Sequence, residues 1–135
     1  MTPAAIVTAD PAGIARASAK LLEGQPVGMP TETVYGLAAD ATNSDAVARL
    51  YAIKNRPNFN PLITHVATTE IARSEGVLDE RAESLAKAFW PGPLTLVVPA
   101  HAEGHTCEVA SSAPRGYQPR RPALPGTQRT DSGSP

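Results

Sequence analysis

The sequence predicts an α/β fold in which a sheet, with strands in mixed directions, is packed against helices. Short apolar runs alternate with amphipathic stretches through residues 1–100. Aromatic residues make up only 4% of the chain, so alanine, valine, leucine and isoleucine must fill the core, as in sheets that helices cover. The 135 residues are enough for one compact domain but not for two.

Four runs have the composition of strands. They are rich in β-branched or other apolar residues, and prolines or glycines lie beside most of them. The expected strands are residues 5–8, 27–30, 62–66 and 94–98. The connections between them are too irregular to require an all-parallel sheet.

Helices are expected between these strands. The first covers residues 12–23, with Gly24 at the stop. The clearest covers residues 44–54, where we expect Ser44 to cap the start and Lys54 to lie on the core-facing side of the last turn. A third runs through residues 85–89, and Asp79 is its expected cap.

The composition changes near residue 100 and divides the chain into two predicted parts. Residues 1–100 form the predicted domain, which is incomplete, and residues 101–135 form a tail. The tail contains five prolines, four glycines and four serines but few large apolar side chains. Such a segment buries too little apolar surface to offset the cost of ordering its backbone. We therefore expect the tail to be disordered.

Charge and cysteine content exclude several classes of protein. With a net charge of −1, the chain has no overall positive charge to attract nucleic acid. One cysteine, Cys107, permits neither an intrachain disulfide nor a cysteine-rich zinc site. The chain also has no signal-like start and no apolar run near the about 20 residues that span a bilayer. A cytoplasmic location, away from membranes, is the expectation.

The first segment whose side chains could bind a ligand is the polar turn after the strand at 27–30. Thr31 and Thr33 alternate with Glu32, so their hydroxyls can point the same way. Ligands of α/β sheets usually bind at strand ends, where hydroxyls and backbone N–H groups can hold a small polar substrate. The alternative is a purely structural turn, which the local pattern by itself favours.

The second segment begins at the end of the helix at 44–54. Lys54 and Arg56 enter a loop stiffened by Pro57 and Pro61, with Asn58 between them. Two converging cations form an anion site, in which arginine offers a bidentate fork and lysine a point charge. The equally weighted alternative is that Lys54 stabilises the helix end and Arg56 is solvated.

The remaining candidates are weaker by local pattern. Trp90 precedes a Pro-Gly-Pro turn that leads to Thr95. Such a segment is more often a structurally packed corner than part of a ligand-binding site. His65 lies on an apolar strand, where a histidine is more often structural than catalytic. The sequence has no glycine-rich phosphate loop, no Ser/His/Asp pattern and no metal-ligand cluster. Bound ATP would need cations and strand-end groups, with Mg²⁺ carried largely by its phosphates.

Together, three motifs resemble the YrdC-like family. They are Pro-Thr-Glu-Thr-Val-Tyr-Gly-Leu at 30–37, Lys-x-Arg-Pro with Asn-Pro-Leu-Ile at 54–63, and Trp-Pro-Gly-Pro-Leu-Thr at 90–95. Each motif is weak alone, but all three in this order are specific. The resemblance covers about residues 5–99. It implies a twisted α/β sheet with a large, positively charged cavity.

The resemblance also implies a reaction. Members combine L-threonine, bicarbonate and ATP into L-threonylcarbamoyl-AMP and release pyrophosphate. This activity makes the expected enzyme a nucleotidyltransferase. Partner proteins in a tRNA-modifying transferase complex then move the threonylcarbamoyl group to a tRNA adenosine. Some members use a basic concave surface to bind double-stranded RNA.

By match of motif, the resemblance also assigns residues. Thr31 would contact substrate threonine, with Thr33 and His65 as further substrate-binding candidates. The nucleotide phosphates would be held by Lys54, Arg56 and Asn58, with Thr95 as a further candidate. Lys54 and Arg56 would carry the catalysis, since a cation pair must neutralise two anionic reactants and the charge that builds at the α-phosphoryl group.

The tail departs from the family, which continues with an arginine-bearing strand and a Ser-x-Asn motif. Ser111-Ser112 does not match in context. We interpret the change as a reading-frame shift or truncation, which leaves an inactive fragment as one alternative. A non-catalytic RNA-binding module is another, weakened by ten acids against eight bases in residues 1–100. A carbamoyl-transfer module of hydrogenase maturation would carry zinc-finger and acylphosphatase parts, which the chain does not contain.

Overall fold

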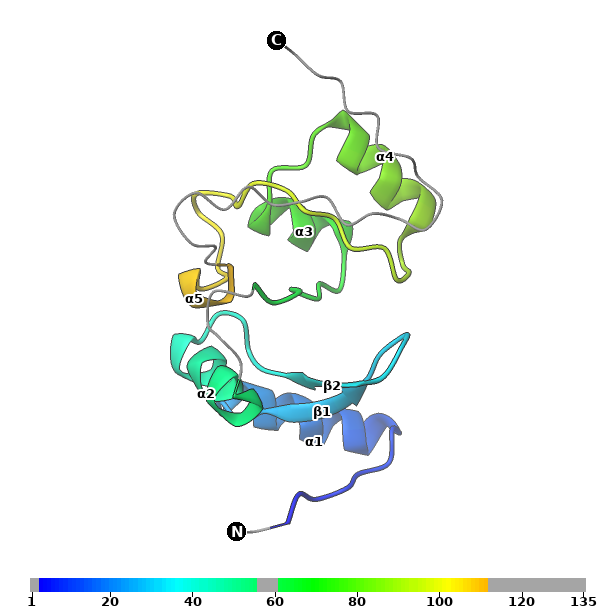
Figure 1. The fold of residues 1–135 in the computed structure, drawn as a ribbon. Coiled ribbons are helices and arrows are strands. Elements are labelled where there is room, and N and C mark those ends of the chain that lie inside the picture. Colours follow the sequence, from blue (N-terminus) through cyan, green and yellow to red (C-terminus); the bar gives the residue numbers. More distant parts are fainter. Residues whose placement is uncertain (1–2, 56–60, 112–135) are drawn as a thin grey trace. The chain divides into compact units, whose positions relative to one another are not determined.

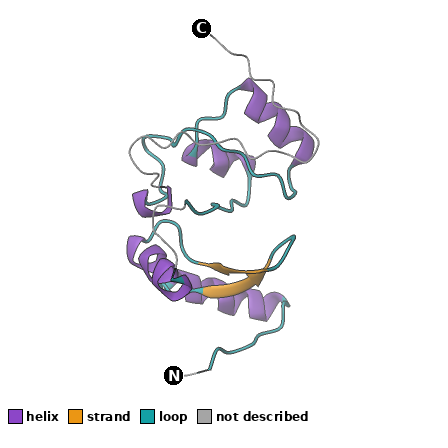
Figure 2. Cartoon of the chain, in the orientation of Figure 1, coloured by secondary structure: helices purple, strands orange, loops and turns teal. Residues whose placement is uncertain are grey.

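The computed structural model describes residues 3–55 and 61–111, which divide into two units (Figure 1). The first unit comprises residues 3–55, 61–65 and 105–111, and the second comprises residues 66–104. In chain order the elements are α1 (Pro11–Leu22), β1 (Val27–Pro30), β2 (Tyr35–Ala38), α2 (Ser44–Lys54), α3 (Thr69–Glu75), α4 (Glu80–Phe89) and α5 (Glu108–Ser111). Figure 2 shows β1 and β2 as a single hairpin.

Helix α1 begins and ends within one residue of its predicted bounds. The carboxylate of Asp10 caps the start by accepting a hydrogen bond from the Gly13 amide at 2.8 Å. At the other end the Gly24 amide donates to the carbonyl of Leu21, and Gly24 adopts a φ of 76°. Glycine enters this left-handed region without the steric cost that a Cβ imposes, which confirms the predicted stop.

Strands β1 and β2 pair in an antiparallel manner across a four-residue turn. Val27 lies opposite Ala38 and Pro30 lies opposite Tyr35. β1 confirms the predicted strand, whereas β2 was not expected, because its four residues are too few to show alternation of apolar and polar side chains. The polar turn that contains Thr31 and Thr33 is therefore the tip of a hairpin.

Helix α2 has the predicted bounds but a different cap. The side chain of Asn43, not of Ser44, accepts the amides of Asp45 and Ala46, both at 3.1 Å. Asn43 has the extended backbone of a cap residue, and Ser44 is already the first helical residue, so the expectation for Ser44 was wrong. Lys54 was also expected on the core-facing side but is exposed.

Removing the observed cap tests this assignment. Asn43→Ala should lower the free energy of unfolding by about 1 kcal/mol, because two amides at the helix start lose their acceptor. Ser44→Ala is the matched control and should leave stability nearly unchanged. Urea unfolding of the three chains measures both effects. A larger loss for Ser44→Ala than for Asn43→Ala would contradict the observed cap.

The core of the first unit lies between α2 and α5. Val47 and Tyr51 of α2 are 1% and 5% exposed and pack with Ala110 of α5, which is 2% exposed. The amide of Leu62 donates to the carbonyl of Ala110 at 3.1 Å, which ties the chain after α2 to α5. Helix α5 was not expected, because residues 101–135 carry few apolar side chains.

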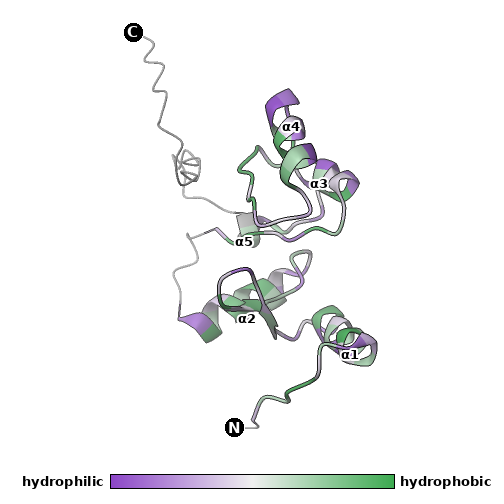
Figure 3. Cartoon of the chain, turned by 90° about the vertical axis from the view of Figure 1, so that its right-hand side faces the viewer, coloured by the Kyte–Doolittle hydropathy of each residue, from purple (hydrophilic) through white to green (hydrophobic). Residues whose placement is uncertain are grey.

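The second unit contains α3 and α4. The carboxylate of Asp79 accepts the Ala82 amide at 2.8 Å and caps α4, as predicted. Helix α3 was not predicted, although Thr68 is a cap signal that its hydroxyl confirms by accepting the Ile71 amide. Figure 3 shows hydrophilic and hydrophobic residues interspersed along α3 and α4, as on amphipathic helices.

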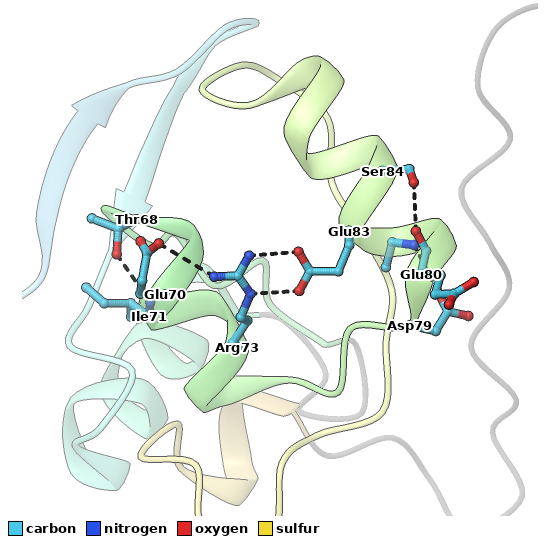
Figure 4. A network of polar contacts seen from close by, with 9 residues as sticks. Thr68, Glu70, Ile71, Arg73, Asp79, Glu80, Glu83 and Ser84 are labelled. Carbon is cyan, nitrogen blue, oxygen red and sulfur yellow. Dashed lines mark hydrogen bonds and ion pairs between the residues drawn. The ribbon is translucent and has the colours of Figure 1, made fainter.

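An ion pair connects these two helices. The Nε and Nη2 atoms of Arg73 donate to the two carboxylate oxygens of Glu83 at 2.7 and 2.8 Å (Figure 4). Glu70 lies 3.5 Å from the same guanidinium. The hydrogen bonds from Arg73 lower the pKa of Glu83 below its ordinary value of 4.5, against a smaller opposing effect of burial. The same hydrogen bonds raise the pKa of Arg73.

This pair predicts a pH dependence of stability. Because the folded-state pKa of Glu83 is lowered, its contribution is present above pH 4.5 and is lost as pH falls through the folded pKa. Glu83→Gln should therefore lose less stability at acid pH than the unchanged chain does. Glu70→Gln should have a smaller effect on this acid dependence, because the Glu70 carboxylate is more exposed and more distant from Arg73. Urea unfolding at a series of acid pH values measures the difference. Equal profiles for the two variants would contradict the prediction, and high salt should shrink the effect.

Three expected strands do not form in the described residues. The segments 5–8, 62–66 and 94–98 lie in loops and do not pair as strands. A strand needs a hydrogen-bonded neighbour as well as a suitable composition, and Ile6 and Ile63 are instead 98% and 62% exposed. The only bridge outside the hairpin in the described residues joins Gly76 to Ala100.

Most of the predicted tail lies outside the described residues. Residues 112–135 belong to that undescribed part, while residues 101–111 include α5. The boundary at residue 100 stays a prediction. Within residues 3–55 and 61–111, every helix is too short or too polar to cross a bilayer.

Candidate functional site

The hairpin turn is organised by one hydroxyl. Thr31 Oγ1 donates to the carbonyl of Val34 and accepts the amides of Val34 at 3.2 Å and Thr33 at 3.4 Å. The Thr31 amide also donates to the Val34 carbonyl at 3.2 Å. A hydroxyl has one proton to donate and two lone pairs that accept. These contacts therefore use the full hydrogen-bonding capacity of the Thr31 hydroxyl.

The second threonine of the turn has a different role. Thr33 is exposed, and its hydroxyl lies 3.5 Å from Thr31 Oγ1. That separation is at the outer limit of a hydrogen bond, so the Thr33 hydroxyl keeps most of its capacity. The structure thus brings the two predicted hydroxyls together, with Thr31 holding the turn and Thr33 presented to solvent.

Gly36 explains how the Thr31 side chain is seated. A Cβ at Gly36 would lie 3.3 Å from Thr31 Cγ2, closer than most carbon contacts. The glycine therefore leaves room for the threonine methyl group across the hairpin. Thr31 is half-buried, while Val34 is 70% exposed at the tip.

Lys54 lies at the end of α2 and is exposed. Asn55 follows it with a φ of 46°, in the left-handed region that ends helices. The register places the start of α2 after the end of β2 that is remote from the turn, and Figure 1 shows α2 beyond that end of the hairpin. No hydrogen bond or ion pair joins Lys54 to the turn in the described part of the first unit.

The other predicted site residues have diverse environments. Arg56 and Asn58 lie outside the described residues. His65 is exposed in a loop of the first unit. Thr95 is half-buried in the second unit, where the indole N–H of Trp90 donates to the Leu94 carbonyl at 2.7 Å. That bond supports the packed-corner interpretation of the Trp-Pro-Gly-Pro segment.

The second unit also has a shallow hollow of about 310 Å³ that sequence reasoning missed. It lies beside the ion pair of Figure 4. Its lining balances two acidic with two basic side chains, so no net charge selects a ligand. The lining residues are Thr69, Glu70, Arg73, Glu83, Ser84 and Lys87. None of them belongs to the three sequence motifs.

The described residues contain no group of three histidine, cysteine, aspartate or glutamate side chains able to hold a metal ion. In this part of the chain the chemically distinctive feature is therefore the hydroxyl-bearing turn. Its exposed hydroxyl, that of Thr33, is suited to a small polar ligand.

Comparison with known proteins decides the family. A family model for the Sua5, YciO and YrdC proteins, described as telomere recombination, matches residues 19–115. The chain belongs to the Sua5/YciO/YrdC family. The match extends beyond residue 99, where the motif resemblance stops. The YrdC-like resemblance of the sequence is thereby confirmed.

Two curated relatives of this chain are named threonylcarbamoyl-AMP synthase. A threonylcarbamoyl-AMP synthase of Bacillus subtilis is 50% identical over 99 residues, which are 73% of this chain and 29% of that protein. One from Pyrococcus abyssi is 54% identical over 80 residues, covering 57% of this chain and 23% of that protein. The chain thus spans about three-tenths or less of the length of these relatives.

Solved structures confirm the predicted α/β fold class of the Sua5/YciO/YrdC family. A double variant of P. abyssi Sua5 superposes with a TM-score of 0.69 at 45% identity, over 73% of this chain and 30% of that one. P. abyssi Sua5 in complex with L-threonine superposes with a TM-score of 0.68 at 45% identity, over 73% and 28%.

Proposed function

We propose that this chain carries the substrate-binding part of an L-threonylcarbamoyl-AMP synthase. The observation that carries the proposal is the turn at Thr31–Val34, with its presented hydroxyl, in a chain 45% identical to a structure that binds L-threonine. The proposed enzyme is a nucleotidyltransferase that uses L-threonine, bicarbonate and ATP. Its products are threonylcarbamoyl-AMP and pyrophosphate.

The reaction needs electrostatic help more than a nucleophilic side chain. The threonine nitrogen takes up bicarbonate to form a carbamate, with loss of water. A carbamate oxygen then attacks the α-phosphorus of ATP, and pyrophosphate leaves. Two anions must approach each other, so we assign Lys54 and Arg56 to neutralise them and to stabilise charge at the α-phosphoryl group.

The remaining assignments follow the same chemistry. Asn58 and Thr95 are proposed to contact the nucleotide, and His65 the threonine. Mg²⁺ would travel with ATP, carried largely on its phosphates.

The hydrogen bonds of the turn refine the roles of the two threonines. The hydroxyl of Thr31 is used within the turn, so Thr31 is proposed to position the loop and to touch substrate through its exposed surface. Thr33 is proposed to offer its hydroxyl to the ligand.

Thr33→Val tests this division of roles. The change keeps the shape but removes one hydroxyl, so L-threonine should bind up to about tenfold more weakly while the unfolding free energy stays nearly constant. Thr42→Val is the matched control, since Thr42 donates only to Asp40, outside the turn. Isothermal titration with L-threonine, and with L-valine as the ligand without a hydroxyl, measures the effect. An unchanged L-threonine affinity for Thr33→Val would overturn the assignment.

The reaction class has its own test. Pyrophosphate release from ATP should depend on both L-threonine and bicarbonate. Release that is independent of either would contradict the proposal, even if L-threonine binds. Binding of L-threonine without any turnover would instead favour the inactive-fragment alternative.

The product suggests the proposed partner. Threonylcarbamoyl-AMP is a mixed anhydride that water attacks, so a transferase acting on tRNA adenosine is proposed to consume it. Direct RNA binding is the weaker alternative, because acids outnumber bases in residues 1–100. Salt-sensitive retention of double-stranded RNA without pyrophosphate release would favour that alternative.

A further inference from the structure

A glycine of β2 lies beside the threonine that organises the turn. Gly36 is opposite Met29 in the register of the hairpin, and Thr31 continues the pairing by donating its amide to the carbonyl of Val34 at 3.2 Å. Thr31 and Gly36 are therefore diagonal neighbours across the hairpin, a spacing that side chains can bridge. The methyl group of Thr31 does so, because its Cγ2 would lie 3.3 Å from a Cβ built at Gly36.

The position of this methyl group is coupled to the position of the Thr31 hydroxyl. Both groups are bonded to the same Cβ, so rotation about the Cα–Cβ bond moves them together. With the methyl group beside Gly36, the hydroxyl donates to the carbonyl of Val34 and accepts the amides of Val34 and Thr33. Another staggered rotamer would carry the hydroxyl away from these partners.

The turn has little room to adjust to a Cβ at position 36. A carbon–carbon separation of 3.3 Å is shorter than the optimal contact of about 3.5–4.0 Å, so Thr31 would have to move by a few tenths of an ångström. Its hydroxyl is held by three partners, and the bonds it accepts, at 3.2 and 3.4 Å, are already at the long end of the hydrogen-bond range. Displacement of the methyl group should therefore loosen the turn.

The second glycine of the hairpin lacks this contact. A Cβ built at Gly28 meets no atom within 4 Å. Neither Gly28 nor Gly36 has a positive φ, so an added Cβ strains the backbone at neither position. Glycine within a strand costs stability and often marks a point of close approach. Of these two glycines only Gly36 has such an approach, and the approaching group is the Thr31 methyl.

We propose that Gly36 is a positioning residue of the L-threonine site. By leaving space for the Thr31 methyl group, it selects the rotamer in which the Thr31 hydroxyl orders the turn. The ordered turn holds the exposed hydroxyl of Thr33, 3.5 Å from Thr31 Oγ1, in place for the ligand. Gly36 thus acts through Thr31 without touching the substrate. The identity of the ligand rests on the proposed function, whereas the effect of Gly36 on the turn does not.

Gly36→Ala tests the proposal in the full chain, with Gly28→Ala as the matched control. Gly36→Ala should weaken L-threonine binding about three- to tenfold in isothermal titration, because the Thr33 hydroxyl is held less firmly. Gly28→Ala adds the same methyl group to the same hairpin and should leave the affinity unchanged. Circular dichroism should show both variants folded. A loss of binding in Gly36→Ala that only parallels a loss of folded protein would reveal a purely structural role and overturn the proposal.

A second comparison uses Thr31→Ser, which keeps the hydroxyl and removes the methyl group. In this background Gly36→Ala has no methyl group to displace. Gly36→Ala should therefore cost about three- to tenfold in affinity in the unchanged chain but less than about twofold in the Thr31→Ser chain. Equal costs in the two backgrounds would overturn the inference. Should Gly36→Ala alone not fold, a folded double variant that binds like Thr31→Ser supports the contact, and an unfolded double variant overturns it.

Exchange of the Val34 amide proton separates this inference from the proposed function. That amide donates to Thr31 Oγ1, so its exchange with water, measured by NMR, should be at least about threefold faster in Gly36→Ala and unchanged in Gly28→Ala. If the unchanged chain does not bind L-threonine, the proposed function fails, and this exchange rate decides whether Gly36 orders the turn. Unchanged exchange and unchanged L-threonine affinity in Gly36→Ala would overturn the inference and leave the proposed function standing.

Discussion

Lys54→Ala is expected to lower the rate of ATP-dependent pyrophosphate release about 100-fold, the usual effect of removing one donor that stabilises transition-state charge. Lys54 is exposed at the end of α2, immediately before the Asn55 cap, so its loss removes a cation without opening the core. The effect should fall mainly on kcat, because charge grows at the α-phosphoryl group as pyrophosphate leaves. Initial rates of pyrophosphate release across a range of ATP concentrations separate kcat from KM.

Lys20→Ala is the charge-matched control for this experiment. Lys20 lies on α1 in the same unit and pairs with Glu23 at 2.6 Å, with both side chains about half exposed. Such surface pairs contribute little to stability, so this variant should keep full activity. A Lys54→Ala enzyme with unchanged turnover, or equal losses in the two variants, would remove Lys54 from the proposed anion site.

Leu50→Ala is expected to lower the free energy of unfolding by about 2–4 kcal/mol, because a buried leucine is replaced and a cavity remains. Leu50 is 3% exposed on α2, beside Val47 and Tyr51, which form the core cluster with α5. This core is small, so a loss of that size is a large part of the stability expected of a short chain. Urea unfolding followed by circular dichroism measures it.

Ile53→Ala provides the comparison on the same helix. Ile53 is 56% exposed, so its truncation should cost less than about 0.5 kcal/mol. Comparable losses at positions 50 and 53 would mean that α2 does not bury the face seen in the structure. A negligible loss at Leu50 would have the same meaning.

The helices were the most predictable part of the fold. Their signals are local: Asp79 caps α4, Gly24 ends α1, and the apolar spacing within α2 selects the buried face. Neighbouring cap candidates are harder to separate. Asn43 and Ser44 are both good cap residues, and the backbone conformation decided between them.

The strands were less predictable, because a strand depends on a partner elsewhere in the chain. Residues 27–30 found that partner in β2, whereas 62–66 and 94–98 have the composition of strands without pairing as strands in the described structure. The roles of the candidate site residues also depended on the tertiary structure. Alternating threonines predicted two neighbouring hydroxyls, but only the hydrogen bonds of the turn distinguish Thr31 from Thr33.

By itself the sequence determined the family, through three motifs in order, and the positions of α1, α2 and α4, through caps and apolar spacing. Those are properties of short segments, which carry their own physical cause. Tertiary structure alone decided that the threonine turn is the tip of a hairpin, that α5 completes the core of the first unit and that Gly28 faces open space. The packing of α5 against α2 brings together residues distant in sequence, and the hairpin depends on which segments pair, so neither is encoded by one local pattern.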